Sequence, residues 1–255
     1  MNTVLEVKDL CKTYVTNKRQ NNVLRNVNFK VRQGEMLAVM GPSGSGKSTL
    51  LYAVSGMDSA TAGSVRFGEK ELTAMNQKQL AELRLNEMGF IFQQMFMLKN
   101  LSILDNVILP AFQSKKNTAS RSEKTEYGKS LLRKLGIIEV ADNDISEVSG
   151  GQLQRACICR SLVNHPQMIF ADEPTGALNR TASQEVMEQL QKVNDDGTTI
   201  LMVTHDVRVA ARCGRVLYIQ DGGIASEKVL GPLHAEQDLR VRERELNNWL
   251  VDQGW

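Results

Sequence analysis

Alternating apolar and polar positions dominate the first forty residues. The two kinds alternate over residues 4–9 and again over residues 23–31, which precede a Gln33-Gly34-Glu35 turn. A period of two is typical of strands with one buried face. We therefore predict antiparallel β-structure that leads into a buried strand over residues 36–40, and a further strand of that sheet over residues 63–67.

Three later apolar runs, residues 168–171, 199–204 and 216–219, are separated by stretches compatible with helices. Such runs predict strands that are covered on both faces, so we expect a mostly parallel sheet in an α/β fold. Asp172-Glu173 and His205 directly follow the first two runs. Because the carboxyl ends of parallel strands line the ligand crevice, these side chains are expected to converge on the loop after residues 36–40.

Residues 95–162 differ from the flanking segments in their sequence pattern and are predicted to be mainly helical. Within them Ser120 and Glu123 fit a capping box, and Gly136 is suited to end the helix that follows it. The last segment, residues 233–255, is predicted to be an amphipathic helix, which either packs on its own core, the favoured interpretation, or supports a dimer. Its apolar residues recur at one-face helical spacing: Leu239, Leu246, Trp249 and Leu250.

Composition narrows the picture only a little. The chain has 255 residues, 42% of them apolar and 24% charged, as in ordinary soluble proteins, and its net charge of +2 gives no reason to expect a nucleic acid partner. No apolar stretch approaches the ~18 residues of a spanning helix. We expect a cytosolic chain unless a partner holds it at a membrane. The four cysteines form no C-x-x-C pair and are expected to be reduced structural thiols.

A glycine-rich loop follows the predicted strand over residues 36–40. Its glycines allow backbone N–H groups to turn inward around an anion, and the helix that follows directs its positive end at the same point. Lys47 is predicted to contact the β- and γ-phosphates, and the Ser48 hydroxyl to be a Mg²⁺ ligand. The loop reads Gly41, Pro42, Ser43, Gly44, Ser45, Gly46, Lys47, Ser48 and Thr49.

The carboxylate pair at residues 172 and 173 suits hydrolysis of a phosphoanhydride, which needs a held metal and a positioned water. Asp172 is predicted to hold Mg²⁺ through its water shell, and Glu173 to orient or deprotonate the attacking water. The alternative is a pair of solvated carboxylates at a strand end. A lone His205 would more often bond a backbone carbonyl, but its place after a buried strand favours a functional role.

A second glycine motif, Val148 followed by Ser149, Gly150, Gly151 and Gln152, precedes a predicted helix over residues 153–162. It is either a second anion site or simply a helix-capping turn. Together with the phosphate loop, it makes the chain resemble the nucleotide-binding subunit of ATP-binding cassette (ABC) transporters. In that family two chains pack head to tail, and the signature of one closes over the γ-phosphate held by the other.

The resemblance covers residues 3–230 and implies an ABC ATPase fold. This fold has a P-loop NTPase core with a mostly parallel sheet, an antiparallel β subdomain and an inserted helical subdomain. The implied division is an ABC ATPase domain over residues 1–231, with the helical subdomain at about 94–160, and a C-terminal helix over 232–255. The implied cofactors are ATP and Mg²⁺.

The resemblance also implies roles for single residues. Tyr14 matches the aromatic residue that stacks on adenine, although it could also be an ordinary strand tyrosine. Gln93 matches the glutamine that contacts Mg²⁺ and the water, although it could be a plain polar strand end. Glu173 matches the catalytic base and His205 the switch histidine.

Two positions depart from the family pattern. Val148 replaces the usual leucine of the signature, a loss of one methylene that should be tolerated. Asn179 stands where most of the family has aspartate, and the lost charge puts communication between the two ATP sites in doubt. The Ala177-Leu178-Asn179 variant resembles the subgroup that works with peptide-antibiotic permeases, as in bacitracin and lantibiotic systems. The rest of the chain is similar to the group of macrolide exporters and lipoprotein-release ATPases.

These features predict a bacterial ATPase subunit that forms a homodimer on MgATP and drives a separate integral-membrane permease. Antimicrobial peptides are the expected substrates. The chain would lie at the cytoplasmic face of the membrane, held by the permease through a groove beside residues 93–110. The apolar residues there line that groove or belong to the core: Leu101, Ile103, Leu104 and Leu109.

One main alternative to this function is left open by the sequence, and two others are disfavoured. The main one is the ATPase of a mechanotransmission complex that regulates cell-wall hydrolases and moves no substrate, because its motifs would be identical. A ribosome or DNA factor is disfavoured, since the cassette is single and uninterrupted and no basic stripe is present. A catalytically dead cassette is disfavoured because Lys47, Asp172, Glu173 and His205 are all present.

Overall fold

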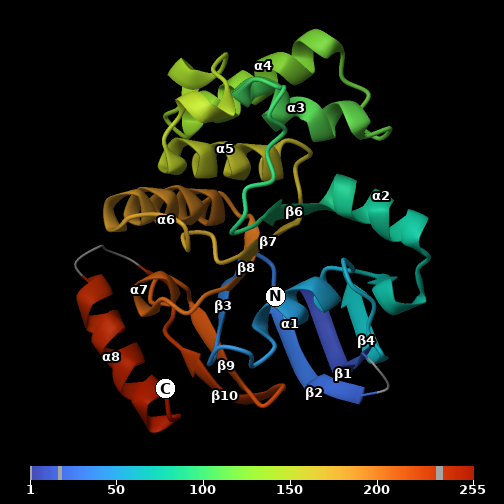
Figure 1. The fold of residues 1–255 in the computed structure, drawn as a ribbon, viewed down its shortest axis with the longest axis vertical. Helices are drawn as coiled ribbons and strands as arrows, with labels where there is room; N and C mark the ends of the chain where they lie inside the picture. Colours follow the sequence, from blue (N-terminus) through green and yellow to red (C-terminus); the bar gives the residue numbers. More distant parts are fainter. Residues whose placement is uncertain (1, 17–18, 234–237) are drawn as a thin grey trace. The chain divides into compact units, whose positions relative to one another are not determined.

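The computed structural model describes residues 2–16, 19–233 and 238–255 (Figure 1). Residues 234–237 of the predicted C-terminal helix, and residues 1 and 17–18 of the predicted ATPase domain, lie outside the described residues. The chain forms two compact units: Met1–Leu80 with Thr199–Trp255, and Ala81–Thr198. It passes from the first unit to the second within α2 (Gln77–Glu87).

An antiparallel sheet forms one part of the first unit, with the strand order β2-β1-β4-β5. Along β1, Leu5 and Val7 are buried two residues apart, as expected of a sheet with one covered face, and the buried Leu10 follows a register shift in the pairing with β2. The predicted antiparallel strands, including the one over residues 63–67, are therefore confirmed. The strands are β1 (Thr3–Thr16), β2 (Arg19–Arg32), β4 (Ala62–Phe67) and β5 (Lys70–Glu71), followed by a 3-10 turn, η1 (Leu72–Ala74).

The second part of the first unit is built on β3 (Met36–Met40), which lies between two parallel neighbours. Every residue of β3 and of its neighbour β8 is buried, so the predicted strands covered on both faces are confirmed. The remaining strand, β10, pairs antiparallel with β9 at the edge. The elements are β8 (Thr199–Val203), β9 (Arg215–Gln220), β10 (Gly223–Val229), α1 (Lys47–Val54) after β3 and α7 (Val207–Ala210) after β8.

The C-terminal helix α8 (Leu239–Asp252) packs against the rest of the first unit, as predicted from its one-face apolar pattern. Leu246 and Leu250 are fully buried. The rings of Trp249 and Trp255 meet Tyr218 of β9 edge to face, with centroids 6.2 and 6.3 Å apart. The helix is thus fixed by aromatic and aliphatic contacts from the strand beside it.

The second unit combines a short parallel pair of strands with helices (Figure 1). The predicted capping box at Ser120 and Glu123 is present, and Gly136 ends the helix with a φ of +66°, a conformation that favours glycine. Gly128 allows α3 and α4 to approach closely, because a Cβ there would lie 2.3 Å from Ile108 Cγ2. The elements are β6 (Met88–Ile91), α3 (Ile103–Gln113), α4 (Arg121–Lys134), η2 (Ile138–Val140), η3 (Ile145–Glu147), α5 (Gly150–Leu162), β7 (Met168–Asp172) and α6 (Arg180–Asp195).

Candidate functional site

The loop between β3 and α1 has a backbone that its glycines make possible. Gly44 and Gly46 have φ values of +79° and +101°, in the region that side chains with a Cβ rarely adopt. Gly41 lies against the neighbouring strand, where a Cβ would come within 2.2 Å of the Ile219 carbonyl oxygen. The glycine spacing read from the sequence therefore corresponds to real steric requirements of this loop.

The ammonium group of Lys47 turns back over the loop. Its Nζ donates to the carbonyl oxygens of Gly41 at 2.8 Å and Pro42 at 2.9 Å. Helix α1 begins at this lysine, and within the described part of the chain no side chain caps its start and no acidic residue lies in its first turn. The ammonium and the positive end of the helix are thus combined at one loop, which suits a phosphate chain. The buried Ser45 hydroxyl has no hydrogen-bond partner among the described residues, which fits a loop shaped for an anion.

Two further predicted residues belong to the first unit. Tyr14 of β1 is 39% exposed, and its hydroxyl donates to Asp58 Oδ2 at 2.6 Å. Burial, with the nearby Asp58, raises the pKa of Tyr14, so the ring stays neutral at physiological pH. His205 follows β8, whose Val203 is in register with Val39 of β3. His205 therefore lies beside the strand end from which the phosphate loop departs, as the parallel pairing leads one to expect.

An acidic group adjoins His205. Burial alone would raise the pKa of Asp206, but its hydrogen bonds with Arg208, and more weakly the charge of His205, hold that pKa below its ordinary value. Arg208 binds both carboxylate oxygens, with Nε 3.0 Å from Oδ1 and Nη2 2.6 Å from Oδ2. Asp206 also accepts the Arg208 backbone N–H and so caps the short helix α7. This turn fixes the backbone next to the histidine.

The second unit contains the predicted carboxylates. Asp172 ends β7 and is 7% exposed, while Glu173 is half-buried and has a φ of +47°. A left-handed glutamate costs roughly 1 kcal/mol and is held only by its surroundings, a feature that concentrates at functional sites. A Cβ on Gly176 would lie 3.1 Å from Gln93 Nε2 and 3.3 Å from Glu173 Cβ. The structure thus brings Gln93 and Glu173 together around this glycine.

The predicted metal ligands form a set that suits Mg²⁺. A hydroxyl from Ser48, a carboxamide from Gln93 and a carboxylate from Asp172 are oxygen donors, and so small a set leaves places for waters and phosphate oxygens. Across residues 2–16, 19–233 and 238–255, no three His, Cys, Asp or Glu side chains gather into a metal site. The chemistry of the predicted donors, all of them oxygen atoms, fits Mg²⁺. Ser48 belongs to the first unit, and the other two belong to the second.

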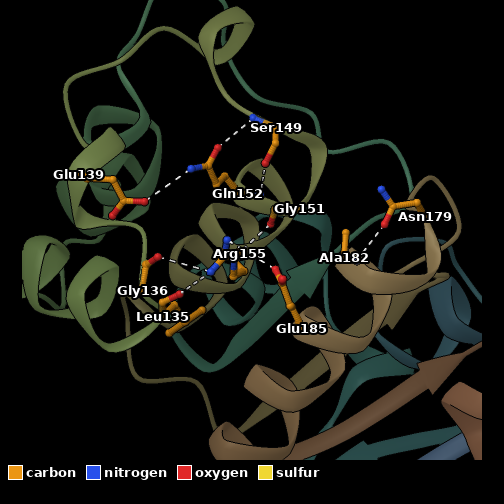
Figure 2. A network of polar contacts seen from close by, with 10 residues as sticks. All are labelled: Leu135, Gly136, Glu139, Ser149, Gly151, Gln152, Arg155, Asn179, Ala182 and Glu185. Atoms are coloured by element: carbon orange, nitrogen blue, oxygen red, sulfur yellow. Dashed lines mark hydrogen bonds and ion pairs between the residues drawn. The ribbon is translucent and has the colours of Figure 1, made fainter.

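The second glycine motif starts α5 with a complete capping box (Figure 2). The Ser149 hydroxyl accepts from the backbone N–H of Gln152 at 3.2 Å, and Gln152 Oε1 accepts from the N–H of Ser149 at 3.0 Å. The helix-capping turn is therefore present. It does not exclude an anion contact, because a hydroxyl that accepts the cap bond still has its proton to donate.

Arg155 lies one turn into α5 and connects the start of this helix to its neighbours (Figure 2). The sequence predictions did not include this residue. Its guanidinium donates to the carbonyl oxygens of Leu135 at 3.3 Å, Gly136 at 3.4 Å and Gly151 at 3.4 Å, and it lies 3.8 Å from Glu185 of α6. Arg155 thus joins the signature turn to the end of α4 and to α6. The only local signal is an arginine one turn into a helix, which usually indicates a solvated face.

Asn179, the departure from the family pattern, caps the start of α6 (Figure 2). Its Oδ1 accepts from the backbone N–H of Ala182 at 2.9 Å. A residue at this helix-capping position needs a side-chain acceptor but does not need a charge, so asparagine can replace aspartate there.

The segment beside residues 93–110 divides into core and surface. Ile103 and Leu104 are 0% and 6% exposed, so they belong to the core and do not line a groove. Phe96 and Leu98 are 63% and 51% exposed instead. Two polar side chains hold this loop. Arg160 donates to the Met95 and Phe96 carbonyl oxygens, and Asn106 bonds both backbone groups of Leu98.

None of the helices in the described part of the chain has the length and apolar character needed to cross a membrane.

Comparisons with known proteins identify the family. Residues 24–176 match the family model described as ABC transporter. The chain is 39% identical over 225 residues to the bacitracin export ATP-binding protein BceA of Halalkalibacterium halodurans, covering 88% of each. It is 42% identical over 221 residues to the macrolide export ATP-binding/permease protein MacB of Campylobacter jejuni, covering 87% of this chain and 33% of that protein.

The solved structures agree. A dimeric post-hydrolysis form of the ATP-binding cassette MJ0796 bound to ADP and Pi superimposes with a TM-score of 0.83 at 34% identity, covering 90% of this chain and 100% of that one. The fold is the ABC ATPase fold expected from the sequence, with parallel and antiparallel strands and accompanying helices. This protein belongs to the ABC transporter family, as an ATP-binding cassette.

Proposed function

We propose that this chain binds and hydrolyses ATP, dimerises on MgATP and drives a separate membrane permease in resistance to antimicrobial peptides. The observation that carries this proposal is the presence of two glycine-rich helix starts in one chain, at Gly46-Lys47 and at Ser149-Gly150. One phosphate chain needs only one such site in a monomer. A second site on the same chain is useful when it meets the nucleotide of another copy.

The chain's own residues have complementary roles in this proposal. The loop amides and Lys47 bind the phosphates, and Ser48, Gln93 and Asp172 would hold Mg²⁺. When bound, the metal neutralises charge on the phosphate oxygens. Glu173 takes a proton from the attacking water at its carboxylate. Its position beside Gln93, around Gly176, supports this role, because both side chains are predicted to contact that water.

The γ-phosphate is clamped by His205 of one protomer and by the signature turn of the other. The Ser149 hydroxyl donates to a phosphate oxygen while its lone pair retains the cap bond from Gln152. Backbone N–H groups, or the correct spacing between them, come from the other loop residues and from the turn. These include Pro42, Ser43 and Thr49 of the loop and Gly150 and Gly151 of the turn. Tyr14 stacks on the adenine. The solved relative is a dimeric ATP-binding cassette, which supports the homodimer.

The names of the relatives support the proposed substrate and partner. BceA is named for bacitracin export and matches this chain over 88% of both lengths, which supports a separate permease and a peptide-antibiotic substrate. The MacB proteins are named ATP-binding/permease proteins, and this chain spans about a third of their length. We place the chain at the cytoplasmic face of a bacterial membrane, and the exposed Phe96 and Leu98 are proposed to contact the permease. We also propose an ABC ATPase domain over 1–231, with a helical subdomain at about 94–160, and a C-terminal helix over 232–255.

The test uses a tagged Glu173→Gln chain, locked with ATP and extracted gently from native membranes. A co-purifying multi-span permease with a sizeable extracytoplasmic domain supports the proposal. A small four-span partner bound to wall hydrolases would replace peptide resistance with mechanotransmission. Ribosomes or DNA in the purified complex would overturn the membrane function altogether. Lys47→Ala, which should not lock on ATP, is the matched control.

A further inference from the structure

Lys12 of β1 is a buried lysine whose surroundings have a definite order. It is 6% exposed, and its Nζ donates to Asp58 Oδ1 at 2.7 Å and to the Ser59 carbonyl oxygen at 2.6 Å. The same Nζ lies 4.7 Å from the ring centroid of Tyr14, over the ring. Lysines are almost never buried unless they are paired. The three contacts match the three N–H donors of an ammonium group.

Asp58 connects this lysine to the tyrosine. One carboxylate oxygen accepts from Lys12 and the other accepts from the Tyr14 hydroxyl at 2.6 Å. Burial would raise the pKa of Asp58, but the hydrogen bonds from Lys12 and Tyr14 outweigh it and hold that pKa below its ordinary value. The carboxylate is therefore ionised at neutral pH and holds the phenol at its tip while the ammonium covers one face.

The arrangement is anchored to the phosphate-binding helix. The backbone N–H of Asp58 donates to the Tyr52 carbonyl oxygen of α1 at 3.0 Å. On the other side, the backbone N–H of Thr13 donates to Thr61 Oγ1 at 2.9 Å, which joins the strand to the same loop. The tyrosine ring is thus tied, through the loop over residues 57–61, to the helix that starts in the phosphate loop.

We propose that Lys12 and Asp58 are positioning residues that fix Tyr14 as a one-sided platform for the base of the bound nucleotide. The proposal rests on the proposed function, in which Tyr14 stacks on adenine. With Lys12 on one face and Asp58 at the hydroxyl, the ring presents a single face to a ligand. A cation on one face also draws the electron density of the ring toward itself, which reduces repulsion of a base stacked on the opposite face.

The experiment compares ADP with inorganic pyrophosphate, each with Mg²⁺, by titration calorimetry on the full chain. The two ligands share the diphosphate and differ in the nucleoside, so a platform effect appears with ADP alone. The variants are Lys12→Met, Tyr14→Ala and their combination. Asp58→Asn, which keeps an acceptor and loses the charge, is a milder second variant. Lys8→Met removes an exposed lysine of the same strand and is the matched control.

We expect Lys12→Met to weaken ADP binding about threefold to tenfold and to leave pyrophosphate binding within about twofold. It should cause no further loss when Tyr14 is already alanine, and Asp58→Asn should give a smaller loss of the same kind. Equal weakening of both ligands, or additive losses of Lys12→Met and Tyr14→Ala, would overturn the proposal. If Tyr14→Ala leaves ADP binding unchanged, the platform fails while the nucleotide site stands. If the parental chain binds neither ligand, the proposed function fails with it.

Discussion

Replacing Arg242 with methionine should release the C-terminal helix. Arg242 lies on the inner face of α8, is 8% exposed, and donates through all its N–H groups to backbone carbonyls of the first unit. No carboxylate forms an ion pair with it among the described residues. The acceptors and distances are Ala211 at 2.7 Å, Cys213 at 2.7 Å, Leu230 at 3.2 Å, Gly231 at 3.1 Å and Pro232 at 3.1 Å.

The expected loss in the free energy of unfolding depends on whether water can reach the carbonyl oxygens that Arg242 leaves. Pro232 is exposed and Leu230 and Gly231 lie at partly exposed positions, so their carbonyls can be hydrated once the guanidinium is gone. Ala211 and Cys213 are fully buried, so each would leave an acceptor without a partner. Two such acceptors cost about 1–3 kcal/mol each. The methionine stem and the relief of burying a charge offset part of this, and we expect a loss of about 3 kcal/mol.

Tryptophan fluorescence reports this event directly, because the chain's two tryptophans are Trp249 and Trp255. Both pack on Tyr218, so release of α8 should shift their emission to the red. In urea the fluorescence midpoint of Arg242→Met should fall by about 1–2 M. Arg244→Met, on the exposed side of the same helix, should change stability by less than about 0.5 kcal/mol. Equal midpoints for the two variants would refute the anchoring role of Arg242.

Further predictions concern thiols, a helix cap, a close contact and pH. Burial raises the pKa of Cys157 to about 11 and of Cys213 to about 12, and Cys159 is also buried. The native chain at pH 8 should therefore react with a thiol reagent at Cys11 alone. Reaction of all four thiols before unfolding would contradict this prediction. Asn179→Asp should retain the cap and stabilise α6 by about 0.3–1 kcal/mol in urea unfolding, since it adds charge at a helix N-terminus; no gain would count against the cap. Gly89→Ala should lower the free energy of unfolding by about 1–3 kcal/mol, because its Cβ would lie 2.6 Å from the Ser161 carbonyl oxygen. Gly223→Ala is the control and should cause no such loss, because its Cβ would meet no atom nearer than 3.6 Å. The depressed pKa of Asp58 means that its contribution to stability is complete above about pH 4 and is lost as pH falls through its folded pKa, so the stability difference between the parent and Asp58→Asn should shrink in acid.

Much of the fold could be predicted because its strands follow simple rules. The β1 alternation and the continuous runs of β3 and β8 have distinct periods, and each appears in the structure as a sheet of the expected kind. The phosphate loop was equally readable, since the positive φ at Gly44 and Gly46 is a demand that only glycine meets without strain.

The missed features are polar groups in unusual surroundings. Arg242 occupies the apolar face of α8, and its acceptors come from carbonyls about 10 to 31 residues away, so no local pattern marks it. Lys12 is similar, because its partner Asp58 lies 46 residues along the chain. The left-handed backbone at Glu173 also has no sequence signal, since such φ values are expected at glycine and asparagine.

The apolar positions beside residues 93–110 show a further limit of pattern reasoning. Leucines and isoleucines at helical spacing indicate that one face is covered, and they do not tell whether the cover is the chain itself or a partner. Burial of Ile103 and Leu104 decides for the chain itself, and the exposed Phe96 lies outside any periodic pattern.

The most direct test of the central claim is the behaviour of Glu173→Gln with MgATP. The account predicts that this variant binds ATP, loses turnover by at least about a hundredfold, and accumulates as a dimer of twice 28.4 kDa in light scattering. The amide keeps the shape of the side chain and cannot take a proton from water. Parental rates of hydrolysis, or a monomer that binds ATP normally, would contradict the assignment of Glu173 and the dimer that depends on it.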